Sequence, residues 1–121
     1  MAEKYLLGEK KSIKASLSEG QAKLLTVAGQ KLMLYRLSDG FYATSHQCTH
    51  LYKSMAKGLI TSDQTIQCPL HRAEFDIRSG EVEQWACFPK GLVDMINVVR
   101  KEKALKTFAI SEDSQGYWIE I

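Results

Sequence analysis

The chain has 121 residues, of which 45% are hydrophobic and 25% are charged, and its formal net charge is +2. This length suits a single domain over residues 1–121 and is too short for two ordinary domains. The basic residues are scattered and no apolar run approaches the roughly 20 residues that span a bilayer, so neither nucleic acid nor a membrane is an expected partner.

The first third of the chain predicts an antiparallel meander. Three short apolar runs, Lys23–Val27, Lys31–Leu37 and Phe41–Ser45, are separated by turn-forming stretches. The pair Asp39-Gly40 suits a tight hairpin, because glycine adopts positive φ at little steric cost.

A turn-rich middle over residues 46–80 is followed by a segment with a different period. Leu92, Ile96 and Val99 lie near one side of a 3.6-residue helix, and a polar stretch follows them. One short helix is therefore expected within residues 91–106.

The carboxyl end predicts a closing hairpin. Its strands are Thr107–Ile110 and Tyr117–Ile121, joined by a polar turn. Tyr117, Ile119 and Ile121 alternate and therefore share one face of the second strand. Most expected elements are strands, which indicates an all-β fold.

The chain contains three cysteines, Cys48, Cys68 and Cys87. An odd number cannot be fully paired within the chain and does not resemble a disulfide framework. No export signal is recognisable, so a reducing, cytoplasmic setting is expected. Cys87 is interpreted as a small buried hydrophobic residue.

Two short motifs bring cysteine and histidine together. Cys48 and His50 form C-x-H, and Cys68 and His71 form C-x-x-H. Rieske centres replace two cysteines on one iron of a [2Fe–2S] cluster with histidines, which this set would supply. A structural zinc site is the alternative, but zinc sites more often keep their cysteines together as C-x₂₋₄-C. His46 fits neither motif and is interpreted as a surface or supporting residue.

The stretch Cys48–Gly80 resembles Rieske ferredoxins and the Rieske domains of ring-hydroxylating oxygenases. The resemblance rests on C-T-H-L, C-P-L-H and the F-D-I-R-S-G-E that runs from Phe75 to Glu81. It implies a Rieske-like antiparallel β-sandwich with a two-loop cluster-binding subdomain at about residues 46–80, to which this chain adds one short helical insertion.

The same resemblance implies one [2Fe–2S] cluster per chain, with Cys48 and Cys68 on one iron and His50 and His71 on the other. It implies an electron carrier that accepts single electrons from a flavin-dependent reductase and delivers them to a terminal oxygenase. The chain is not expected to be an enzyme, because His46 is the only histidine left to build a mononuclear iron site. A small Rieske-like subunit of a larger reductase, such as nitrite reductase, is the alternative function.

Positions that raise the potential of respiratory Rieske proteins carry other residues here. Lys53 and Leu70 match the extra disulfide, and Ala73 and Phe75 match the hydroxyl donors. A potential toward the low end of the Rieske range, about −150 to +300 mV, is therefore expected. The stretch from Trp85 to Pro89 is similar to the proline-bearing loop that often covers the cluster in this family.

Overall fold

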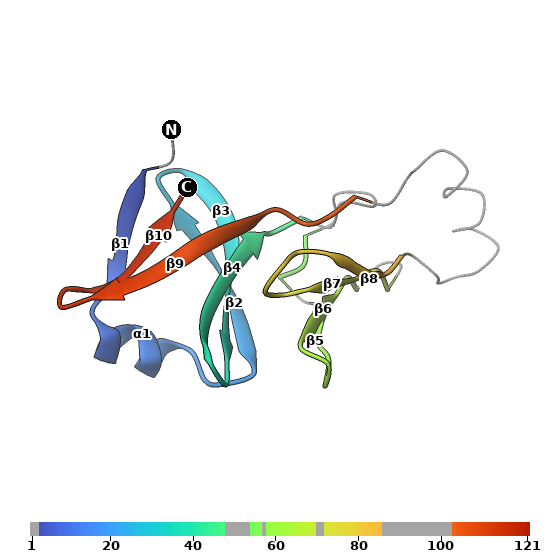
Figure 1. The fold of residues 1–121 in the computed structure, drawn as a ribbon, viewed down its shortest axis with the longest axis horizontal. Helices are drawn as coiled ribbons and strands as arrows, with labels where there is room; N and C mark the ends of the chain where they lie inside the picture. Colours follow the sequence, from blue (N-terminus) through green and yellow to red (C-terminus); the bar gives the residue numbers. More distant parts are fainter. Residues whose placement is uncertain (1–2, 48–53, 57, 70–71, 86–102) are drawn as a thin grey trace.

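The computed structural model describes residues 3–47, 54–56, 58–69, 72–85 and 103–121 (Figure 1). Within these residues the chain forms ten strands and one short helix. In order they are β1 (Lys4–Gly8), α1 (Lys10–Ser16), β2 (Gln21–Val27), β3 (Gln30–Leu37), β4 (Gly40–Ser45), β5 (Leu59–Ile60), β6 (Thr65–Gln67), β7 (Glu74–Asp76), β8 (Val82–Gln84), β9 (Thr107–Asp113) and β10 (Gly116–Glu120).

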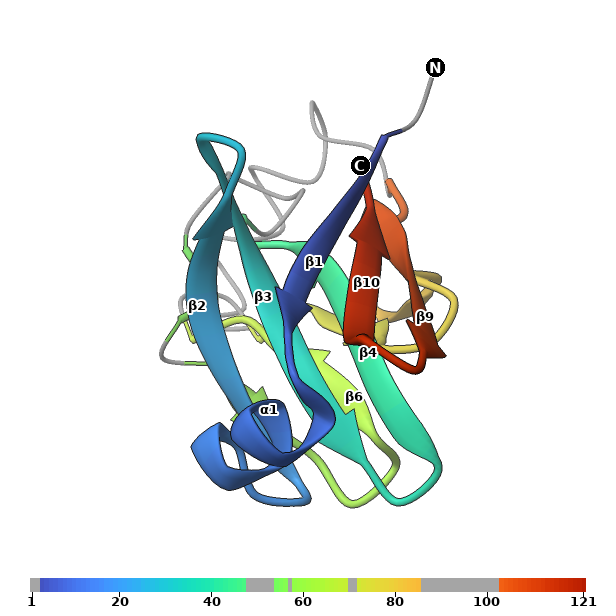
Figure 2. The same ribbon diagram turned by 90° about the vertical axis from the view of Figure 1, so that its left-hand side faces the viewer.

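The strands form two sheets in which every described neighbour pair is antiparallel. The large sheet has the order β1-β10-β9-β4-β3-β2, and the small sheet has the order β5-β6-β7-β8. The large sheet curls, so that β1 passes in front of β3 in Figure 2. Leu7 of β1 and Leu25 of β2, from the two edge strands of this sheet, pack against the same buried residues inside the curl. The expected all-β sandwich is confirmed.

Strand β3 is buried on both faces, because it separates the interior of the curled sheet from the small sheet. Leu32 and Leu34 belong to the cores inside the large sheet. Met33, Tyr35 and Leu37 alternate with them and pack into the core shared with the small sheet. Burying a side chain of this size stabilises the fold by about 1.5–3 kcal/mol, so β3 fixes the small sheet against the sandwich.

Helix α1 was not predicted, and tertiary contacts hold it. Its seven residues are too few for a stable isolated helix, and Ile13 is its buried residue. The Arg36 guanidinium, from β3, donates hydrogen bonds to the carbonyl oxygens of Lys14 at 3.1 Å and Leu17 at 3.0 Å. These bonds satisfy carbonyls at the helix end that have no partner inside the helix.

The expected helix at 91–106 lies mostly outside the described residues. Its last part, residues 103–106, is described and is not helical, so any helix would lie before residue 103 and the expectation stays a prediction. Leu105 is instead held by a backbone hydrogen bond of 2.7 Å from its N–H to the Gly80 carbonyl. No helix in the described part of the chain is long and apolar enough to cross a membrane.

The predicted hairpins are present, but Gly40 lies in strand β4 and not in the turn. Leu37 pairs with Gly40, so Ser38 and Asp39 occupy the turn between β3 and β4. Gly40 takes a positive φ of 145° as the first residue of β4. At the carboxyl end, Gly116 pairs with Asp113 and closes the expected hairpin between β9 and β10.

Candidate metal centre

The first loop, residues 47–54, follows directly from the end of β4. An isolated bridge pairs Gln47 with Ser54, and the Met55 N–H donates to the His46 carbonyl at 2.7 Å. The two ends of the loop are therefore held side by side. Cys48 and His50 belong to this loop by sequence and lie outside the described residues.

The second loop, residues 68–73, connects β6 to β7. The Cys68 N–H donates to the Ala73 carbonyl at 2.8 Å, and the Arg72 N–H donates to the Cys68 carbonyl at 3.1 Å. Arg72 has a positive φ of 62°, and the Gln84 side-chain amide donates to its carbonyl at 3.1 Å. His71 belongs to this loop and lies outside the described residues.

Gly58 brings the two loops to the same end of the small sheet. Its N–H donates to the Met55 carbonyl at 2.8 Å, just after the first loop. A Cβ atom added to Gly58 would lie 2.7 Å from the Gln67 carbonyl oxygen, just before the second loop. A side chain would not fit without backbone movement, so glycine permits this close approach. Pairing of Leu59 with Gln67 continues the contact.

A buried apolar core supports the second loop. Cys68 is 2% exposed and lies in one cluster with Met55, Ile66, Ala73 and Phe75. The Trp85 indole contacts Phe75 edge-on, with ring centroids 6.5 Å apart. Trp85 thus packs beneath the site; the rest of the predicted shielding stretch and Cys87 lie outside the described residues.

The described residues fit a cysteine-ligated group. Both backbone polar groups of Cys68 are hydrogen bonded, which fixes the start of the second loop. The two pinned loops together carry two thiols and two imidazoles, which is the donor set of a Rieske cluster. Three of these four residues lie outside the described ranges, so the ligand assignment stays a prediction. Within those ranges, no group of three or more metal-binding side chains occurs.

A buried hydroxyl chain leads from the sheet to the first loop. The Thr44 hydroxyl donates to the Ser45 carbonyl at 2.9 Å, so the Tyr35 hydroxyl, 2.8 Å away, donates to the Thr44 oxygen. Burial raises the pKa of Tyr35, which stays protonated. His46 follows and is half-buried; its buried Nδ1 has no hydrogen-bond partner among the described residues.

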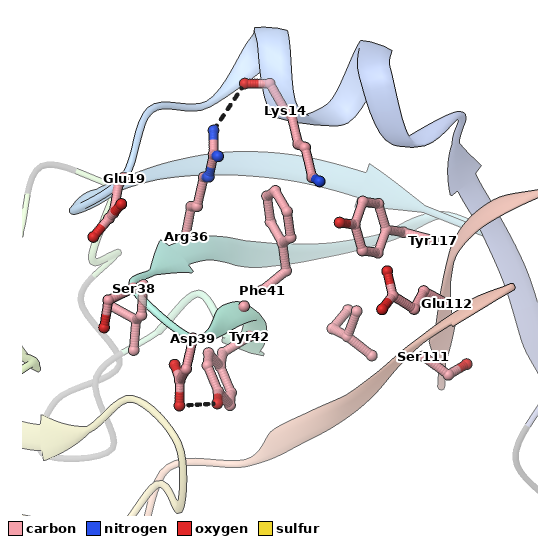
Figure 3. Close-up of a pocket in the computed structure, with 13 residues that line it drawn as sticks. Lys14, Glu19, Arg36, Ser38, Asp39, Phe41, Tyr42, Ser111, Glu112 and Tyr117 are labelled. Carbon is pink, nitrogen blue, oxygen red and sulfur yellow. Dashed lines mark hydrogen bonds between the residues drawn. The ribbon is translucent and has the colours of Figure 1, made fainter.

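A cavity of about 480 Å³ lies at the opposite end of β4, between α1 and the β3–β4 turn (Figure 3). The rings of Phe41 and Tyr117 meet there, with centroids 4.7 Å apart. Two of its charged groups have structural partners: Arg36 holds the end of α1, and Asp39 accepts hydrogen bonds from Tyr42 and Arg78. This cavity is separate from the two loops.

Sequence reasoning located both motifs but missed the residues that position them. Gly58 and the buried Tyr35–Thr44 pair were not identified. Gly58 is the one glycine between the two motifs, and its position in the sequence could have indicated a close approach of the backbone there. No local pattern marks Tyr35, because its role depends on pairing between β3 and β4.

Comparison with known proteins places this arrangement in a family. The Rieske [2Fe-2S] domain family matches residues 4–109. The 3-phenylpropionate/cinnamic acid dioxygenase ferredoxin subunit of Escherichia coli K12 is 32% identical over 75 residues, covering 62% of this chain and 67% of that protein.

Solved structures share the fold. The ferredoxin of carbazole 1,9a-dioxygenase from Nocardioides aromaticivorans IC177 matches with a TM-score of 0.70 and 20% identity, over 99% of this chain and 96% of its own. A chain in the complex of reduced oxygenase and oxidized ferredoxin in carbazole 1,9a-dioxygenase matches with a TM-score of 0.71 and 21% identity, over 96% and 91%. The chain therefore belongs to the Rieske [2Fe-2S] domain family.

Proposed function

We propose that this protein is a ferredoxin that carries single electrons from a flavin-dependent reductase to a terminal oxygenase. The observation that carries the proposal is the pair of pinned loops at one end of the small sheet, one with C-x-H and one with C-x-x-H. This pairing places one thiol and one imidazole on each loop. A carrier needs such a site near the surface and needs no substrate pocket beside it.

A bound [2Fe–2S] cluster supplies the capacity to take up and release one electron. Cys48, His50, Cys68 and His71 would hold it. The chain's own contribution is to fix the loops that present these residues, through the backbone bonds at Gln47–Ser54 and Cys68–Ala73. The buried apolar cluster around Cys68 shields one side of the site from solvent.

The relatives support the carrier role and its acceptor. The Escherichia coli relative is a ferredoxin subunit of a dioxygenase, and a carbazole 1,9a-dioxygenase ferredoxin is seen in complex with its oxygenase. The reductase is inferred from the resemblance of the motifs. A catalytic iron site in this chain is not supported, because only His46 remains beyond the four predicted ligands.

The first test is spectroscopic. We expect a red-brown protein with two irons per chain, whose visible absorption bleaches with dithionite. Low-temperature EPR of the reduced form should show the low average g value of a histidine-ligated cluster. A colourless protein with one zinc per chain would refute the proposal.

The ligand assignment is tested by substitution. Cys68→Ser should abolish the native EPR signal and lower the iron content, because it removes one predicted ligand. His71→Cys should abolish the native EPR signal, because a thiolate would replace a predicted imidazole ligand. Cys87→Ser is the matched control and should keep both. Loss of the cluster in the control, or its retention in both ligand variants, would show that the assignment is wrong.

The carrier role is tested by reconstitution. The protein should be reduced by NADH only when a flavin-dependent reductase is added, and should then be reoxidised by a terminal oxygenase. Purification from its native host should yield a chain separable from both. Permanent co-purification with a large reductase subunit would favour the subunit function instead.

A further inference from the structure

A cavity of about 380 Å³ lies across the ends of three neighbouring strands. Leu32 of β3 pairs with Ser45 of β4, and the Ser45 N–H donates to the Lys106 carbonyl just before β9. These pairings bring together the β2–β3 turn, the end of β4 and the approach to β9. These three segments contribute the following lining side chains: Lys31, Ser45, His46, Gln47, Lys103 and Lys106.

The described acidic and basic side chains that line this basic cavity are all basic. Among the described residues that line it there are three lysines and no carboxylate. Lys31 and Lys106 are exposed, and neither takes part in the ion pairs of the described residues, which join Lys10 to Glu112 and Arg78 to Asp39. The Lys106 ammonium lies 5.2 Å from the centre of the Phe108 ring, which orients it.

The basic cavity adjoins the first loop. Gln47 lines it and immediately precedes Cys48, and the Gln47–Ser54 bridge closes that loop. A charge in the basic cavity therefore attracts or repels a molecule that approaches the first loop. Exposed lysines are compact, hydrated charges that attract an opposite surface over about a Debye length, roughly 10 Å at 0.1 M salt.

We propose that the basic cavity docks a carboxylate-rich surface of the protein's electron-transfer partner. The proposal rests on the proposed function, which requires a partner to approach the two loops. A protein surface suits the cavity better than a small free anion, because its lysines are exposed and spread over three segments. Such charges speed encounter and fix orientation more than they add tight affinity.

The variant for the test is the double substitution Lys31→Glu and Lys106→Glu. Lys11→Glu together with Lys14→Glu is the matched control, with the same change in net charge on exposed positions of α1. Helix α1 lies at the other end of the large sheet (Figure 1). Circular dichroism of each variant establishes that the fold is kept before binding is measured.

Binding is measured by fluorescence anisotropy with fluorescein-labelled hexaglutamate at low ionic strength. We expect roughly tenfold weaker binding for the cavity variant and a change within about twofold for the control. Equal weakening in both would overturn the proposal. Displacement of the peptide by inorganic phosphate at an equal concentration of phosphate would also overturn it, because the cavity would then be a small-anion site.

Electron transfer gives a second readout. Ferricyanide, an anion, accepts one electron from the dithionite-reduced protein, and tris(phenanthroline)cobalt(III), a cation, does the same. We expect the cavity variant to react about tenfold more slowly with ferricyanide and no more slowly with the cobalt complex, with the difference fading in high salt. Unchanged ferricyanide kinetics would overturn the proposal. Absence of iron would instead refute the proposed function, and the hexaglutamate result would stand apart from it.

Discussion

Replacing Gly80 with alanine should strongly destabilise the protein, because this glycine joins the returning chain to the small sheet. Gly80 has a φ of +77°, and a Cβ atom there would lie 2.0 Å from the Leu105 carbonyl oxygen. The Leu105 N–H also donates to the Gly80 carbonyl at 2.7 Å, and the Leu105 side chain is 3% exposed. The alanine methyl group would meet a backbone carbonyl oxygen, and neither atom can move away by a rotamer change.

Gly29→Ala provides a matched control. Gly29 has a φ of +80°, and an added Cβ atom would meet nothing within 4 Å. Both substitutions incur the left-handed backbone cost of about 1–2 kcal/mol and the same gain from a stiffer unfolded chain. Their difference therefore isolates the contact with Leu105.

The expected difference follows from what the contact supports. Moving Leu105 away loses a hydrogen bond of about 0.5–1.5 kcal/mol and part of a buried leucine's 1.5–3 kcal/mol. We expect Gly80→Ala to cost about 2–4 kcal/mol more than Gly29→Ala, a large share of the 5–15 kcal/mol typical of a domain.

Urea unfolding followed by circular dichroism measures this difference, with iron content recorded in parallel. With a slope of about 2 kcal/mol per molar urea, the two midpoints should differ by about 1–2 M. If the free energies of unfolding of the two variants agree within about 0.5 kcal/mol, Leu105 does not lie against Gly80 and the prediction is wrong.

Three further outcomes are expected. Tyr35→Phe should lower the free energy of unfolding by about 1 kcal/mol in urea melts, because Thr44 loses a buried hydrogen bond; no change would contradict the buried geometry. Ala73→Ser should raise the midpoint potential by roughly 40–60 mV in a spectroelectrochemical titration, if its hydroxyl donates a hydrogen bond of about 1 kcal/mol to the cluster. The Arg78 guanidinium lowers the pKa of the Asp39 carboxyl below its usual 3.8. The ion pair therefore stabilises the fold fully above pH 3.8, and this stabilisation is lost as the pH falls through the lowered pKa of the folded state. Asp39→Asn should therefore flatten the acid end of the stability profile, and an unchanged slope below pH 4 would count against the pair.

Local chemistry in the sequence was enough to predict the meander, the closing hairpin and both cysteine–histidine motifs. The alternation of Tyr117 and Ile119 places both in the core, and their period of two depends on strand geometry alone. The motifs could be recognised because a metal site requires particular atoms at short spacing, whatever surrounds them.

Tertiary structure decided what the sequence pattern could not carry. Helix α1 depends on Arg36, which lies on a strand about twenty residues away and holds its last carbonyls. The role of Gly58 depends on the backbone of Gln67 across the small sheet. The basic cavity gathers Lys31 and Lys106, 75 residues apart in the chain, because β3, β4 and β9 are neighbours in one sheet. Strand order arises from burial and long-range pairing of whole elements, so no local stretch of sequence contains it.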